Sequence, residues 1–135
     1  DELSGVTGCE RLTAEGMLVI PEAVSASDAD CLRQLVLARI AEVEEAMAEQ
    51  GQHRLGGSTH YKYAELVHRG DQRWDMSIHR NGEAVGSETA KSDPRVHVLE
   101  RIAREGPWLA TIEAMLHEHR WEAGAVVSRP GAVGQ

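Results

Sequence analysis

The seven histidines are the residues of this chain whose type could bind a metal ion. The closest cluster is His117-Glu118-His119. A spacing of two suits ligands on a strand, but these residues fall near the end of an expected helix, where alternate residues diverge. The remaining histidines are dispersed without ligand spacing: His53, His60, His68, His79 and His97. We therefore expect a structural or solvated role for His117 and His119. A metal-binding domain built on these two residues is an alternative to the two function classes given at the end of this section.

A second chemical pattern lies between Arg73 and His79. Trp74, Met76 and Ile78 alternate there with polar residues, which is the period of two typical of a strand. The pattern has two interpretations. One is a sheet with a core face and a polar face, and the other is that Arg73 or Trp74 lines a substrate cavity. The sequence leaves both open.

Composition excludes several classes of function. The chain has 135 residues, 41% of them apolar, which fits one domain with a real core. A net charge of −8 argues against nucleic acid or an anionic membrane as a partner. Cys9 and Cys31 are too few for a disulfide scaffold, and no signal peptide or membrane span is visible. We expect a cytoplasmic protein.

The first half of the chain predicts a strand followed by a long helix. Met17–Ile20 is expected to be a short strand that Pro21 ends, and Ser25 or Ser27 is expected to cap the following helix. That helix is predicted over Ala29–Gln50, with Gly51 as its stop. Its apolar positions recur every three or four residues and form one face: Leu32, Leu35, Val36, Ile40, Val43 and Met47.

The second half predicts further strands, loops and helices. We expect loops over Gln52–Thr59 and Gly82–Ser92, the latter mobile, and possible strands over Tyr61–Val67 and Arg73–His79, with a turn at Asn81-Gly82. Asp93 and Pro94 have the residue types of a helix cap and first helical position. The predicted helices are Asp93–Glu105, with Val96, Leu99, Ile102 and Ala103 inward, and Trp108–His117, with Leu109, Ile112 and Leu116 inward.

The last segment is apolar and then breaks sharply. Ala123–Ser128 is rich in small and β-branched residues and predicts a buried strand. Arg129-Pro130-Gly131 ends it, because proline cannot donate to a ladder and glycine tolerates a positive φ. Gln135 follows four residues later.

Two segments together resemble the phytanoyl-CoA dioxygenase-like family of iron(II)- and 2-oxoglutarate-dependent oxygenases. Residues 128–135 match the family's pattern S-x-P-G-A-x-x-Q, which runs into an iron-binding His-x-Asp pair. Residues 16–25 read G-M-L-V-I-P-E-A-V-S, similar to the family opening G-F/Y-x-V-I/V-P-x-x-L/V-S/T, with Met17 in place of the usual aromatic residue.

The resemblance implies an α+β fold, the N-terminal portion of a double-stranded β-helix (jelly-roll or cupin-like) whose major sheet the three helices buttress. It implies an oxidoreductase that uses Fe(II), 2-oxoglutarate and O2 to hydroxylate a small organic substrate. Gln135 would help to hold 2-oxoglutarate, and residues 1–135 would form a single domain truncated before the iron ligands. The family's 2-oxoglutarate lysine is not placed, since nothing around Lys91 matches.

A competing class is a small non-enzymatic α+β interaction domain that ends at Gln135 by nature. The two classes differ in what the gene encodes next. A His-x-Asp within a few residues favours the oxygenase, and a stop codon favours the interaction domain. The substrate stays open, although the acidic balance and the lack of a basic cluster favour a small natural-product-like or amino-acid-like molecule over an acyl-CoA.

Overall fold

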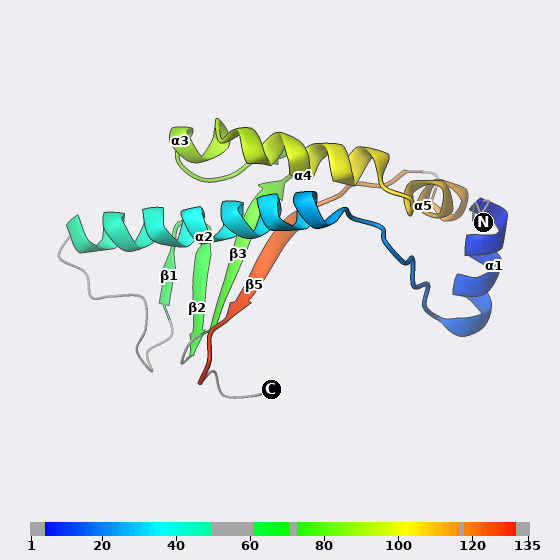
Figure 1. The fold of residues 1–135 in the computed structure, drawn as a ribbon, viewed down its shortest axis with the longest axis horizontal. Helices are drawn as coiled ribbons and strands as arrows, with labels where there is room; N and C mark the ends of the chain where they lie inside the picture. Colours follow the sequence, from blue (N-terminus) through cyan, green and yellow to red (C-terminus); the bar gives the residue numbers. More distant parts are fainter. Residues whose placement is uncertain (1–4, 50–60, 71–72, 117, 132–135) are drawn as a thin grey trace.

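The protein is described from a computed structural model, which covers residues 5–49, 61–70, 73–116 and 118–131. It combines one antiparallel sheet with helices, so the predicted α+β class is confirmed (Figure 1). None of the helices in these ranges has both the length and the apolar composition of a membrane span.

The sheet has five strands: β1 (Tyr61–Tyr63), β2 (Leu66–Gly70), β3 (Arg73–Arg80), β4 (Glu83–Ala84) and β5 (Ala123–Ser128). Strand β3 is central, because it pairs with β5 along one edge and with β2 and the short β4 along the other. All pairings are antiparallel. The sheet therefore combines four consecutive strands, β1 to β4, with β5, which comes after three intervening helices.

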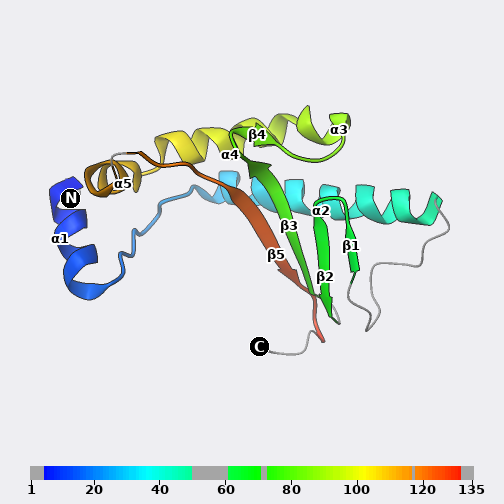
Figure 2. The ribbon, with the colours of Figure 1, turned by 180° about the vertical axis from the view of Figure 1, so that it is seen from behind.

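The helices are α1 (Gly5–Glu15), α2 (Ala26–Glu49), α3 (Glu88–Lys91), α4 (Pro94–Glu105) and α5 (Leu109–Met115). Helix α2 crosses one face of the sheet, and α4 packs beside α2 (Figures 1 and 2). Helix α5 packs against α1, away from the strands. The expectation that residues 108–117 buttress the sheet is wrong, because the helix spans only Leu109–Met115 and packs against α1.

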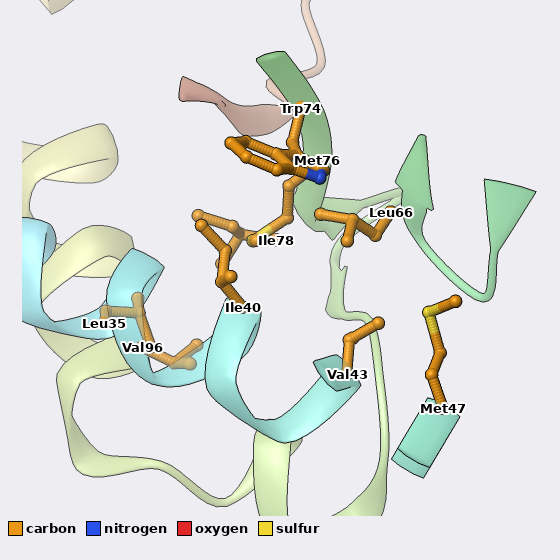
Figure 3. Close-up of a cluster of buried hydrophobic side chains, with 9 residues drawn as sticks. All are labelled: Leu35, Ile40, Val43, Met47, Leu66, Trp74, Met76, Ile78 and Val96. Atoms are coloured by element: carbon orange, nitrogen blue, oxygen red, sulfur yellow. The ribbon is translucent and has the colours of Figure 1, made fainter. Parts of the chain in front are cut away.

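The core lies between α2, α4 and the covered face of the sheet (Figure 3). Its buried side chains are Leu35, Ile40, Val43, Met47, Leu66, Trp74, Met76, Ile78 and Val96. The predicted apolar face of α2 is confirmed, with Leu32 and Val36 partly buried at its margin. The spacing of three and four residues thus correctly identified the face of α2 that packs on the sheet.

Both predicted helix caps are confirmed by their contacts, although α2 begins at Ala26, three residues before the predicted Ala29. Ser25 Oγ accepts from the backbone N–H of Asp28 at 3.1 Å, which caps α2. Asp93 caps α4 by accepting from the N–H of Arg95 at 2.9 Å, with Pro94 at the first helical position. Local residue chemistry was sufficient to define these two boundaries. Gly51, the expected stop of α2, lies outside the described residues.

The expected strand over residues 17–20 is wrong. This segment is extended but pairs with no described strand, and Met17 and Val19 are 65% and 66% exposed. It links α1, which the sequence analysis missed, to α2. A strand needs a hydrogen-bonding neighbour, and the chain supplies none to this segment within the described residues.

Three further expectations need correction. Residues 82–92, expected to be a mobile loop, contain β4 and α3. Residues 61–67 do not form one strand, because a turn with Ala64 at φ 48° divides them into β1 and the start of β2. Strand β5 is at the sheet edge and alternates between half-buried and exposed residues, so it is not buried as expected. The loop predicted over residues 52–59 lies outside the described ranges.

A buried arginine that the sequence analysis did not single out fixes the connection after β4. Arg39 is only 3% exposed, and its Nη1 lies 3.2 Å from Glu42 Oε2. Its Nη2 donates to the carbonyl oxygen of Val85 at 3.4 Å, and Ser87 donates its hydroxyl to Glu42. The hydrogen bonds from Arg39 to Val85 and from Ser87 to Glu42 tie α2 to the segment that leads into α3, so the Arg39–Glu42 charge pair lies where apolar packing would otherwise fill that end of the core.

Candidate functional site

The candidate site lies on the sheet face that α2 and α4 leave uncovered. In Figure 2 the strands lie in front of α2, and none of the helices drawn in colour lies in front of them. Residues on β3 alternate between the two faces, as predicted: Trp74, Met76 and Ile78 are buried under the helices. Arg73, Asp75 and Ser77 point to the other side and are half-buried. The uncovered face is therefore polar along its central strand.

Trp74 does not line this face. Its side chain is fully buried in the core, and the guanidinium carbon of Arg129 lies 4.9 Å from its ring centroid on the covered side. The core interpretation of Trp74 is thus confirmed, and its role in a substrate cavity is excluded by geometry. Arg73 remains on the uncovered face.

Asp75 is the electrostatic centre of the uncovered face. Arg69 Nε donates to Asp75 Oδ2 at 2.6 Å, and Arg73 Nε lies 3.6 Å from Asp75 Oδ1. Arg69 comes from β2 and stays 56% exposed, so most of its guanidinium donors point to solvent. Two cations around one carboxylate leave this cluster with a net positive charge in a chain that is otherwise acidic.

A cleft of about 460 Å³ opens beside this cluster. Its floor is the outer surface of β2, β3 and β5, including Val67, Ser77 and Val126. Arg80 Nη2 donates to Ser77 Oγ at 2.7 Å, so a second guanidinium lies along the wall. A cleft of this size with a few convergent polar groups on an apolar floor has the character of a small-molecule site.

The chemistry available in the cleft is recognition rather than bond breaking. Arginine guanidinium groups bind carboxylates and other planar anions through paired N–H donors. The Ser77 hydroxyl accepts from Arg80 and has no adjacent histidine base among the cleft residues. The described part of the cleft can therefore orient a polar ligand, and a reactive group would have to be supplied by something else.

The histidines do not assemble a metal site within the described ranges. His68 and His79 are buried, whereas His97 and His119 are exposed. His117, His53 and His60 lie outside the described residues. Across the part of the chain that the structure describes, no group of three His, Cys, Asp or Glu side chains could hold a metal ion. These residues alone do not fit the iron that the family resemblance implies.

Gln135, the predicted 2-oxoglutarate contact, also lies outside the described residues. The turn that precedes it is described, with Gly131 at φ 91°, so the predicted break after β5 is confirmed. Cys9 and Cys31 are both free thiols. Lys91 lies on α3 and pairs with Glu88, away from the cleft.

Arg69 and Arg80 are the site residues that the sequence analysis missed. Arg69 reaches Asp75 because β2 pairs with β3 in a register that sets Val67 opposite Asp75. Arg80 ends β3 just before the Asn81-Gly82 turn. The period of two on β3 could have indicated the polar face, but only the pairing register brings Arg69 to it.

The role of the cleft has to be argued from these residues. The residues that line it supply the Asp75 carboxylate held by Arg69, Arg80 on Ser77, a second carboxylate from Glu65, and an apolar floor, whereas Arg73 pairs with Asp75 from outside the cleft. Comparison of the chain with protein-family models, with curated proteins and with solved structures found no match in any of the three.

Proposed function

We propose that this chain is the front, helix-buttressed part of an iron(II)- and 2-oxoglutarate-dependent oxygenase of the phytanoyl-CoA dioxygenase-like type. Its sheet would form part of the major sheet of a double-stranded β-helix. The uncovered sheet face would then be the inner face, and its cleft would hold the substrate of a hydroxylation reaction.

The observation that carries the proposal is the one-sided covering of the sheet. Helices α2 and α4 seal one face with an apolar core, whereas the other face presents Arg69, Asp75 and Ser77 around a cleft. A sheet that serves only as a scaffold needs one buried face and one plainly solvated face. A cleft with converging polar groups on the second face is what a sheet facing an enclosed site would present.

The end of β5 is consistent with the resemblance that the proposal rests on. The strand pairs with β3 up to Ser128, and the chain then turns at Pro130 and Gly131. In the family that the sequence resembles, this strand and turn lead to the cosubstrate glutamine and the iron ligands. By that resemblance, the proposal assigns the 2-His-1-carboxylate triad to residues encoded after Gln135.

Iron and 2-oxoglutarate, when bound, would supply the oxidising chemistry. The residues of this chain would bind and orient the substrate: Arg69 and Arg80 offer donors to a polar or carboxylate group, and Val67 and Val126 offer an apolar floor. A volume of about 460 Å³ suits a small natural-product-like or amino-acid-like molecule.

The first test is the coding sequence after Gln135. The proposal expects a His-x-Asp within a few codons and a further histidine several tens of codons later. The protein with all its encoded residues should then form succinate from 2-oxoglutarate in the presence of iron(II) and O2. A stop codon directly after Gln135 would contradict the proposal.

The second test is Gln135→Ala in that protein. Losing one charge-assisted hydrogen bond of about 1.5–3 kcal/mol should raise the apparent 2-oxoglutarate constant roughly tenfold to a hundredfold. Iron content should stay the same, since glutamine is not one of the triad's ligand types. Gln34→Ala, on the exposed surface of α2, is the matched control and should leave the constant unchanged. Unchanged cosubstrate dependence in iron-loaded Gln135→Ala protein would refute the assigned role.

The competing function is a non-enzymatic interaction domain. The observation that favours it is the edge position of β5, where Val126 is 63% exposed on the uncovered face. An exposed edge strand is a template for pairing with another chain. The coding sequence separates the two functions, because only the oxygenase requires metal ligands after Gln135.

A further inference from the structure

A second cavity, lined by different residues from the cleft, lies between α4, α5 and the segment that leads into β5. Its volume is about 640 Å³, within the range of small-molecule pockets. The segment over residues 119–123 closes one side of it. The proposed oxygenase function makes no use of this cavity.

The apolar walls of the groove come from residues of α4 and α5 that lie outside the core. Val96, in the first turns of α4, is 1% exposed and belongs to the core. The later apolar residues Ile102 and Ala103 are only half-buried and line the groove instead. From α5, Ile112 and Leu116 face them, and Leu116 is 52% exposed. The helix faces that the sequence predicts to be core thus meet across an open space.

Two tryptophans give the groove flat aromatic surfaces. Trp108 lies at the start of α5, and Trp121 lies before β5. The indole of Trp121 is held in place by a stack on buried His79, with ring centroids 3.9 Å apart and planes inclined by 16°. A wall that is fixed in this way offers a ligand ring a preformed stacking surface.

The charges on the rim balance. Arg104 and Arg120 are matched by Glu113 and Glu122, and all four are exposed. A rim with no net charge gives no electrostatic preference for an anion or a cation, and the chain's net charge of −8 opposes anions in general. The rim therefore adds no net attraction for a charged ligand, and the apolar walls and the two tryptophans decide what the groove fits.

We propose that the groove between α4, α5 and residues 119–123 binds a neutral, largely apolar small molecule that carries an aromatic ring. The apolar walls supply the burial, the tryptophans supply ring stacking, and the balanced rim adds no attraction for a charged ligand. This site is separate from the cleft on the sheet, so the proposal stands or fails independently of the oxygenase function.

The test uses N-phenyl-1-naphthylamine, a neutral aromatic probe whose fluorescence rises in apolar surroundings. The full chain should bind one equivalent saturably, with energy transfer from tryptophan. The anionic probe 1-anilinonaphthalene-8-sulfonate, of similar size, should bind at least about tenfold more weakly, because the balanced rim gives its charge no net attraction and the chain's net charge of −8 opposes it. Absence of saturable binding of the neutral probe, or tighter binding of the anionic one, would overturn the proposal.

A matched pair of variants locates the site. Leu116 and Met115 are neighbouring exposed side chains of 52% and 46% exposure, but only Leu116 lines the groove. Leu116→Lys should weaken probe binding by about tenfold or more, because it puts a charge at the apolar wall, and Met115→Lys should leave binding unchanged. Equal effects of the two substitutions would show that the probe binds elsewhere.

A second pair keeps the test decisive if Leu116→Lys disturbs α5. Ala103→Phe should fill the groove and block binding, whereas Ala110→Phe, on the exposed side of α5, should not. Far-ultraviolet circular dichroism confirms folding in each variant. Binding that survives Ala103→Phe in folded protein would refute the site.

Sedimentation over a range of concentrations tests whether a second copy of the chain occupies the groove. A dimer that Leu116→Lys dissociates would mean that a second copy, not a small molecule, covers the groove.

Discussion

The imidazole of His79 lies flat against the indole of Trp121, 3.9 Å between ring centroids, although His79 belongs to the central strand and Trp121 precedes the edge strand. His79 is 1% exposed. Its Nε2 lies 3.5 Å from Glu100 Oε1 on α4, and neither ring nitrogen has a hydrogen-bond partner within the described residues. The ring therefore acts mainly as a packing surface that joins β3, α4 and the segment before β5.

Replacing this ring by an apolar one tests that role. His79→Phe keeps a flat ring against Trp121 and removes two buried polar atoms that lack partners. Stability at pH 7 should stay the same or rise by up to about 1 kcal/mol. His79→Ala should lower it by about 2–4 kcal/mol, because it leaves a cavity. Urea unfolding measures both, and a large loss in the Phe variant would show that the ring nitrogens contribute bonds that the packing argument omits.

The position of His79 also shows where sequence reasoning reaches its limit. The alternation on β3 predicted a polar-facing His79, but the pairing with β5 shifts register between Ser77 and His79, and the shift turns the ring inward. A bulge depends on the partner strand, which lies more than 40 residues away in the sequence. The residues around His79 alone therefore cannot predict the register shift.

Local signals, by contrast, were reliable. The caps Ser25 and Asp93 and the apolar face of α2 depend on residues within one or two turns of each other, and the structure confirms them. The extended residues 17–20 could not be distinguished from a strand, since that depends on a distant partner. The cleft follows the same rule: Asp75 and Ser77 were predicted to share a face, but Arg69 joins them only through strand pairing.

Helix α2 is predicted to be the main support of the sheet. Ile40 is 2% exposed in the core, whereas Leu37 on the same helix is 45% exposed. Ile40→Asp should lower the free energy of unfolding by about 4 kcal/mol or more, because it buries a charge without a partner. Leu37→Asp is the matched control and should change it by about 0.5 kcal/mol at most. Chemical denaturation followed by circular dichroism compares them, and similar losses in both variants would remove α2 from the core.

Gly124 is predicted to be required for the pairing of β5 with β3. A Cβ at this position would lie 2.5 Å from the carbonyl oxygen of Met76, which is backbone and cannot move aside alone. Gly124→Ala should therefore destabilise the protein by about 1–3 kcal/mol. Elsewhere in a strand, replacing glycine by alanine normally raises stability. Val126→Ala, two residues along and 63% exposed, should change stability by only about 0.5 kcal/mol. A stabilised Gly124→Ala variant would show that the two strands lie further apart.

The cap of α4 should make stability depend on pH in the acid range. The Arg95 guanidinium, which donates to Asp93 Oδ2 at 2.5 Å, lowers the pKa of the Asp93 carboxyl below its ordinary value. A lowered pKa in the folded state means that the carboxylate stabilises the fold above the unfolded pKa of about 3.9, and that this contribution is lost as the pH falls through the lower folded pKa. The contribution should therefore be complete at neutral pH, begin to fall below about pH 4, and be lost once the pH is below the lowered pKa of the folded state.

Two substitutions separate the charge of Asp93 from its cap. Asp93→Asn keeps an oxygen that can accept from the Arg95 N–H, and asparagine is a good cap, so this variant loses mainly the charge. Asp93→Ala loses both and should be about 1 kcal/mol less stable than wild type at pH 7 from the cap alone, with the lost ion pair in addition.

The measurement is thermal unfolding from pH 7 to pH 2.5. The melting temperature of wild type should lie above that of Asp93→Asn at neutral pH, and the two should converge below about pH 4. Asp93→Ala should stay below Asp93→Asn throughout, because a cap made by a neutral amide does not titrate. Curves for wild type and Asp93→Asn that run parallel over the whole range would show that the Asp93–Arg95 pair does not stabilise the folded state.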